Sequence, residues 1–163
     1  MVRVLGIDPG VTGAWALIEA KRDGSQRPTL LKIGDLPVKS VTMSKRVTKR
    51  LDVKKCAELI EDLTGEFDRI AIEKLSGAPG IASSTAFALG WTGATLDTIL
   101  TMQGLTYRAP APSTWKKTLR VPADKGASRR WATKLFGSDK GWPRVEDHNR
   151  AEAAMIALWG ALT

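Results

Sequence analysis

The stretch VLGIDPGVTGAW, residues 4–15, decides the fold, because it reads as a buried strand that ends on an aspartate before a turn. The strand carries apolar side chains on both faces, a pattern typical of a central, covered strand: Val2, Val4, Leu5 and Ile7. Asp8 ends it, Pro9 keeps Asp8 extended, and Pro9-Gly10 suits the centre of a type II turn. Asp8 therefore serves either the turn or a metal site at the rim of the sheet.

The composition predicts one compact, cytoplasmic domain that binds a polyanion. The chain has 163 residues, 43% hydrophobic content and a formal net charge of +8. Such a basic excess indicates nucleic acid or an anionic membrane surface as the partner. The N-terminus lacks the apolar run of a signal peptide, and no apolar run is long enough to span a bilayer. The single cysteine, Cys56, excludes a disulfide framework and a cysteine-rich zinc site.

The order of the expected elements indicates an α/β fold. Gly-containing connections between the first strands favour an antiparallel meander, and Asp52 is a good N-cap for a helix that ends near Gly65. Strands are expected at 2–8, 14–20, 29–36, 67–73 and 105–112, and helices at 52–65, 82–103, 113–119, 127–136 and 149–162. We therefore predict a mixed five-stranded sheet flanked by helices.

Two further acids stand out by their positions. Glu73 ends an apolar strand just as Asp8 does, and a glycine-rich loop follows it. Glu152 is the only ionisable side chain between Ala151 and Leu162, in a helix that is apolar nearly all round. A buried carboxylate is costly unless it is paired, hydrogen-bonded or bound to a metal. The alternatives for Glu152 are a salt bridge to Arg150 or a role in capping the helix.

Carboxylates at two strand ends and on a terminal helix can converge if the strands are neighbours. Such hard oxygen ligands suit Mg²⁺, with Mn²⁺ as a substitute, and not structural zinc. A pair of these ions clamps the attacking and leaving oxygens of a phosphodiester. The three acids therefore predict a two-metal hydrolytic site. The lone His148 stands near them as a metal ligand, a proton shuttle or a helix-entry residue.

Taken together, these segments resemble the RuvC family of Holliday junction resolvases, within the RNase H-like superfamily. GIDPGVTG (6–13) resembles the opening motif of the family, and IAIEK (70–74) resembles its second acid motif. Three later segments resemble phage and organellar-type members: APSTWKKTL (111–119), DKGASRRWATKLFG (124–137) and DHNRAEAAMIALWG (147–160). The resemblance implies a single nuclease domain over 1–163 that cleaves Holliday junctions and other branched DNA, leaving 5′-phosphate and 3′-hydroxyl ends. It places the protein in DNA recombination and repair.

The resemblance also implies the site residues. Asp8, Glu73 and Glu152 match the metal ligands of the family. Many members have an acid or a histidine three residues before the last acid, where this chain has Asn149. Asp147 is therefore expected as the fourth ligand, with His148 as the second choice. Bacterial members carry an aromatic residue after the second acid that probes the junction, whereas this chain has KLSGAPG (74–80).

Two basic segments are expected to bind DNA phosphates. Residues 39–55 and 116–134 each hold seven Lys or Arg, together 14 of the 25 in the chain. The alternative is a solvated face. The residues expected to contact DNA are Lys45, Arg46, Lys49, Arg50, Lys116, Lys117, Lys125, Arg129 and Arg130. Among the tryptophans, Trp15, Trp91 and Trp159 are expected in the core, whereas Trp115, Trp131 and Trp142 either stack on bases or anchor the core.

The assembly and two rival functions follow from the same features. A four-way junction has approximate two-fold symmetry and needs paired cuts, which predicts a homodimer. The long helix at 82–103 is the expected interface, because small residues recur on it at Ala86, Gly90, Gly93 and Ala94, and Phe87, Leu89 and Trp91 add apolar area. The alternative is that this surface packs only on the sheet of its own chain. The first rival is a catalytically silent module that binds branched DNA. The second is an actin-like ATPase or sugar kinase, which needs two domains and a longer chain than 163 residues.

Overall fold

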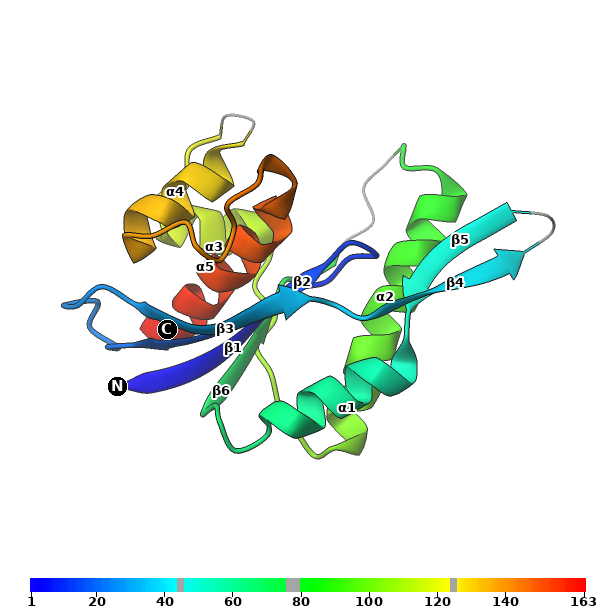
Figure 1. Ribbon diagram of the computed structural model, residues 1–163, viewed down its shortest axis with the longest axis horizontal. Coiled ribbons are helices and arrows are strands. Elements are labelled where there is room, and N and C mark those ends of the chain that lie inside the picture. The colour runs from blue at the N-terminus through cyan, green and yellow to red at the C-terminus, as the bar shows by residue number, and fades with distance from the viewer. Residues whose placement is uncertain (44–45, 76–79, 124–125) are drawn as a thin grey trace.

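The computed structural model describes residues 1–43, 46–75, 80–123 and 126–163 as an α/β fold (Figure 1). Its strands are β1 (Val2–Asp8), β2 (Ala14–Ala20), β3 (Thr29–Asp35), β4 (Val38–Met43), β5 (Arg46–Leu51) and β6 (Arg69–Ile72). Its helices are α1 (Val53–Leu63), α2 (Ser83–Met102), α3 (Pro112–Thr118), α4 (Ala127–Phe136) and α5 (His148–Leu162), and a 3₁₀ turn, η1 (Val145–Asp147), precedes α5. None of the described helices is long and apolar enough to cross a membrane.

The main sheet has the strand order β3-β2-β1-β6. β1 pairs antiparallel with β2 and parallel with β6, and β2 pairs antiparallel with β3. The predicted meander and mixed sheet are confirmed, with the strand that opens the chain in a central position. The segment expected as a fifth strand joins the sheet through a single parallel bridge between Ala71 and Arg108, where the Ile72 amide donates to the Arg108 carbonyl at 2.9 Å.

Alternating side chains of β1 belong to two separate cores. Val2 and Val4 pack with the apolar face of α5, whereas Leu5 and Ile7 pack with α1 and α2. Figure 1 shows the same division, with α3, α4 and α5 on one side of the sheet and α1 and α2 on the other. Because successive side chains of a strand point to opposite faces, Asp8 lies on the same face as Val4, the face that α5 covers.

The turn after β1 differs from the prediction. A type II turn needs a positive φ at Gly10, and Gly10 does not have one. The turn closes further along, where the Gly10 carbonyl accepts a hydrogen bond from the Gly13 amide at 2.9 Å. A Cβ on Gly13 would lie 2.3 Å from the Asp8 carbonyl oxygen, so the chain can fold back this closely only with glycine at position 13.

β4 and β5 form a two-stranded antiparallel sheet of their own, and β5 packs beside α2 (Figure 1). From the sequence, this region read only as part of a basic segment. Its strands were missed because lysine, serine and threonine fill positions where a half-buried strand would carry apolar side chains.

The tryptophans divide differently from the prediction. Trp159 is buried and Trp15 is half-buried against the core, but Trp91 is 41% exposed, so the core prediction for Trp91 is wrong. Trp115 and Trp142 are fully buried. Trp131 is half-buried, and its indole donates to the Leu119 carbonyl at 2.7 Å. Trp115, Trp131 and Trp142, for which base stacking was the other possibility, therefore anchor the core.

Candidate functional site

The ends of β1 and β6 bring Asp8 and Glu73 side by side. Ile7 is paired in register with Ile72, and the Glu73 amide donates to the Ile7 carbonyl at 3.1 Å. Glu73 follows Ala71 by two residues, and Ala71 packs in the core beneath α5. Asp8 and Glu73 therefore both point to the face of the sheet that α5 covers.

The first turns of α5 add Glu152 to this face. The helix lies directly on β1, because a Cβ on Gly6 would be 2.2 Å from the Ala153 carbonyl oxygen. Glu152 immediately precedes Ala153, and Asp8 follows Gly6 by two positions on the same face of β1. The carboxylates of Glu152 and Glu73 both act on the pKa of Asp8. The structure thus brings together the three acids that the sequence singled out.

Side chains of α3 and α4 hold two of the three carboxylates. The Trp115 indole donates to Oε2 of Glu73 at 2.6 Å, and the Ser128 hydroxyl donates to Oε1 of Glu152 at 2.6 Å. Lys116 places its Nζ 3.2 Å from the same Glu152 oxygen. The sequence predicted Lys116 as a DNA contact and gave no signal for Ser128 or for the bond from Trp115. The packing of α3 and α4 against α5 creates all three contacts.

These three acids, Asp8, Glu73 and Glu152, form a carboxyl cluster that carries more negative charge than its surroundings neutralise. Burial raises the pKa of Asp8 to about 8, and repulsion by Glu152 and Glu73 adds to this effect, whereas Lys116 opposes it. Burial also raises the pKa of Glu73, although the hydrogen bond from Trp115 acts in the opposite direction. Carboxyl groups that resist ionisation together are the kind of group that a bound cation stabilises.

The chemistry of this donor set fits Mg²⁺, because three carboxylates offer hard oxygen ligands and excess negative charge. Among the described residues, no group of three or more His, Cys, Asp or Glu side chains is already arranged to hold a metal ion. Glu73 and Glu152 instead direct oxygens at Trp115 and Ser128. Each of these bonds uses one oxygen of its carboxylate, so the second oxygen of each glutamate is the one that would face a cation.

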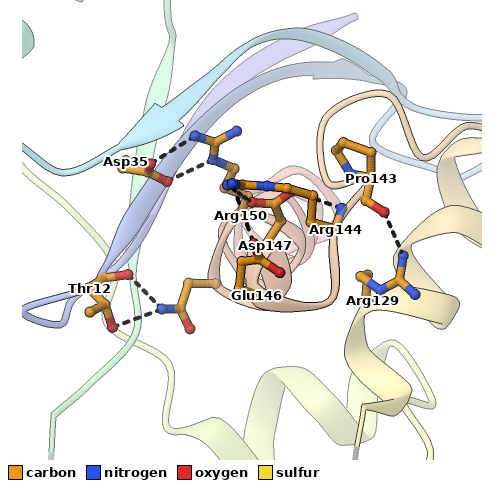
Figure 2. A network of polar contacts seen from close by, with 9 residues as sticks. Thr12, Asp35, Arg129, Pro143, Arg144, Glu146, Asp147 and Arg150 are labelled. Carbon is orange, nitrogen blue, oxygen red and sulfur yellow. Dashed lines mark hydrogen bonds and ion pairs between the residues drawn. The ribbon is translucent and has the colours of Figure 1, made fainter.

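Asp147, expected as the fourth ligand, is directed elsewhere (Figure 2). It is buried, and its carboxylate accepts hydrogen bonds from the backbone amide of Arg144 at 2.9 Å and from the Arg144 guanidinium at 2.7 Å. These bonds and the charge of Arg144 lower the pKa of Asp147. The structure thus brings together Asp8, Glu73 and Glu152 and leaves Asp147 in a pair with Arg144.

The neighbours of Asp147 have separate contacts. Asn149 donates to the carbonyl and the hydroxyl of Thr12, at 2.5 and 3.1 Å, and so ties the start of α5 to the turn after β1. Arg150 forms a two-pronged pair with Asp35 at 2.7 and 2.8 Å, so it is not the partner of Glu152 (Figure 2). His148 is exposed and shares a cavity of about 670 Å³ with Glu152.

The basic residues expected at DNA fall into two regions. Arg129 and Arg130 line the cavity beside Glu152, and Lys117 is exposed on α3. Lys49 and Arg50 lie on β5, beside α2. Lys45 and Lys125 lie outside the described residues, and so does the side chain of Arg46.

The fold and the carboxyl cluster together define an α/β protein with a mixed sheet and with acids at the ends of two neighbouring strands. Among solved structures, the chain is similar to T. thermophilus RuvC in complex with a Holliday junction substrate, with a TM-score of 0.69 and 20% identity over 98% of this chain and 93% of that chain. A second Thermus thermophilus RuvC structure gives a TM-score of 0.67 and 21% identity over 98% and 93%. No family model and no curated protein matches the sequence. The RuvC-like fold that the motifs predicted is confirmed.

We expect the metal-free protein to lose thermal stability as the pH rises from about 4 to about 8. In this range the folded Asp8, with a pKa of about 8 in place of its usual 3.8, keeps a proton that the unfolded chain has released. The raised pKa of Glu73 acts in the same direction. The lowered pKa values of Asp35 and Asp147 act in the opposite direction, but only below about pH 4.

The measurement is Tm against pH in a chelating buffer. An Asp8→Asn variant serves as the control, because it lacks the titrating carboxyl and should show a flatter profile. Added Mg²⁺ should raise the Tm of the wild type most at the alkaline end. A wild-type Tm that stays constant from about pH 5 to pH 8 would contradict the burial and repulsion assigned to Asp8.

Proposed function

We propose that this protein is a divalent-metal-dependent endonuclease that cleaves Holliday junctions and other branched DNA by hydrolysing phosphodiester bonds. The observation that carries the proposal is the convergence of Asp8, Glu73 and Glu152 on one face of the sheet. The net charge of +8 suits a polyanionic substrate. The fold shared with RuvC, which has been solved with a Holliday junction substrate, supports junction DNA as the particular substrate.

Asp8, Glu73 and Glu152 would hold Mg²⁺, and Asp147 or His148 stays a prediction for a fourth ligand. When bound, the metal supplies Lewis-acid activation of the phosphodiester and of the attacking water, and Mn²⁺ is expected to substitute. Trp115 and Ser128 orient the two glutamates through the bonds described above. Lys116, beside Glu152, places a positive charge where the phosphate must approach this acidic cluster.

The experiment is cleavage of a four-way junction in Mg²⁺, with a linear duplex of the same sequence as the matched substrate. The proposal expects cuts in the junction alone and none in a chelating buffer. A junction that is bound but stays uncut in Mg²⁺ and in Mn²⁺ would favour the second candidate, a silent junction-binding module. Two observations favour that candidate: an amide, Asn149, at the position of an acid in the related family, and glutamates turned to protein donors.

We further propose that the protein acts as a homodimer through α2. Ala86, Gly90 and Ala94 are exposed along this helix, and a Cβ on Gly90 would meet nothing within 4 Å. The face of α2 that carries Gly90 therefore has room for a second helix. A Cβ on Gly93, in contrast, would lie 3.5 Å from the Leu75 side chain. Two copies related by a two-fold axis would match the symmetry of a four-way junction.

Sedimentation at micromolar concentration tests the dimer. The expected species has twice the mass of the 17.7 kDa chain. Gly90→Arg should yield a monomer, because the new side chain has room in the free chain but blocks close approach of another helix. Thr101→Arg, at the far end of the same helix, is the control and should leave the dimer intact. A wild-type monomer with and without a junction would defeat the proposal.

A further inference from the structure

A groove separates the β4–β5 hairpin from α2. It has a volume of about 250 Å³ and is bounded by Lys49 and Arg50 on β5, by Phe87 and Trp91 on α2, and by Val11. None of these side chains belongs to the carboxyl cluster. The groove therefore needs its own explanation.

Two aromatic side chains line the groove without being buried in it. Phe87 is 56% exposed and Trp91 is 41% exposed, one helical turn apart. Their ring centroids are 6.3 Å apart, and the ring planes are inclined by 37°. Large aromatic rings are costly to leave in water, and neighbouring exposed rings typically mark a binding surface.

Cations lie beside these rings. The Arg50 guanidinium carbon is 5.2 Å from the centre of Phe87 and 4.7 Å from the centre of Trp91, so it ties the hairpin to the helix and fixes the rings. Lys49 lies on the same wall of the groove. Aromatic rings interleaved with Lys and Arg are the composition that binds single-stranded nucleic acid, in which bases stack on rings and phosphates meet cations.

The groove also borders the turn that follows Asp8. Val11, at one of its edges, lies in the turn that begins directly after Asp8. A DNA strand with a phosphate at the carboxyl cluster would therefore have this groove next to it. A second copy of the protein is a poorer occupant, because two-fold symmetry would bring the same basic groove against itself.

We propose that this groove binds unstacked nucleotides of the DNA strand next to the cleaved bond, with Phe87 and Trp91 as the surfaces on which their bases stack. The inference rests on the proposed function, because the nucleotides in the groove would belong to the unpaired or distorted region of the branched DNA that the protein cleaves. Such a groove would favour branched over linear DNA, because the bases of a continuous duplex stay stacked on one another.

The test measures binding in a chelating buffer, where cleavage plays no part. The probes are an oligothymidine strand, a four-way junction and a linear duplex. Replacing both rings, Phe87→Ala with Trp91→Ala, should weaken binding to the strand and the junction by roughly tenfold per ring, and leave binding to the duplex unchanged. Trp91→Phe should retain most of the affinity. Met102→Ala is the matched control, because Met102 is 83% exposed on the same helix but does not line the groove.

Photocrosslinking gives the position of the contact. A strand or junction that carries 5-iodouracil next to the branch should crosslink to the peptide that contains residues 87–91. Unchanged affinity of the double variant would overturn the proposal, and so would an equal loss on the duplex. A loss of affinity that accompanies a change from dimer to monomer would assign the groove to a second copy instead. If the wild type binds through the two rings but does not cut in Mg²⁺, the proposed function fails and the groove stands.

Discussion

An Asp8→Asn variant is expected to lose cleavage of a four-way junction by roughly a thousandfold and to bind the junction at least as tightly as the wild type. Asparagine has nearly the shape of aspartate, so β1 and the turn after it should be preserved. What changes is the capacity to carry a negative charge beside Glu73 and Glu152, because Asp8 must release its proton to bind a cation and asparagine has none to release. Fewer carboxylates hold the cation less well, and they repel a DNA phosphate less.

The two effects are separated by measuring the cleavage rate and the affinity for the junction for each variant. Glu73→Gln and Glu152→Gln should behave like Asp8→Asn, because all three belong to the same cluster. Asp62→Asn, an exposed acid on α1, is the matched control and should cut like the wild type. An Asp8→Asn protein that cuts near the wild-type rate would remove Asp8 from the metal site. A variant that loses binding as well would indicate a damaged fold.

The positions of these three acids within their strands and helix were predictable, because the pattern of apolar residues around each acid shows where it lies in its element. An apolar run that ends on an acid marks a strand end, and Asp8 and Glu73 both show this pattern. Glu152 was visible as the only charge in an apolar helix. The pairing of β1 with β6, which brings the acids together, was only a condition of the prediction, because no local pattern encodes the pairing of two strands so far apart in the sequence.

The prediction for Asp147 rested on the resemblance to a family and on the spacing from Glu152, and neither shows what a side chain touches. Arg144 lies three residues earlier, and the local 3₁₀ turn lets its amide and guanidinium bind the Asp147 carboxylate. The partners of Glu73 and Glu152 were beyond the sequence for a different reason. Trp115 and Ser128 come from helices whose positions depend on packing against α5. No local pattern encodes such contacts.

A Gly6→Ala variant is expected to lose about 3 kcal/mol of stability, at the upper end of the typical cost of overpacking a core. The added Cβ would lie 2.2 Å from the Ala153 carbonyl oxygen and 2.5 Å from the Ala157 amide nitrogen. Both are backbone atoms of a buried helix, so no side-chain rotation relieves the clash. Either α5 moves away from β1 or the strand shifts, and both changes separate Glu152 from Asp8. Cleavage should therefore fall together with stability.

Urea unfolding measures the loss, as a lower midpoint with an unchanged slope. Gly10→Ala is the matched control, because its nearest neighbour would be 3.6 Å away, and its stability should stay within about 0.5 kcal/mol of the wild type. Adding Ala157→Gly to Gly6→Ala removes only the Ala157 Cβ, which lies 2.7 Å from the new atom. The backbone contacts remain, so this second change should not restore stability. A full rescue would show that side chains, and not the two backbones, set the distance between β1 and the helix that carries Glu152.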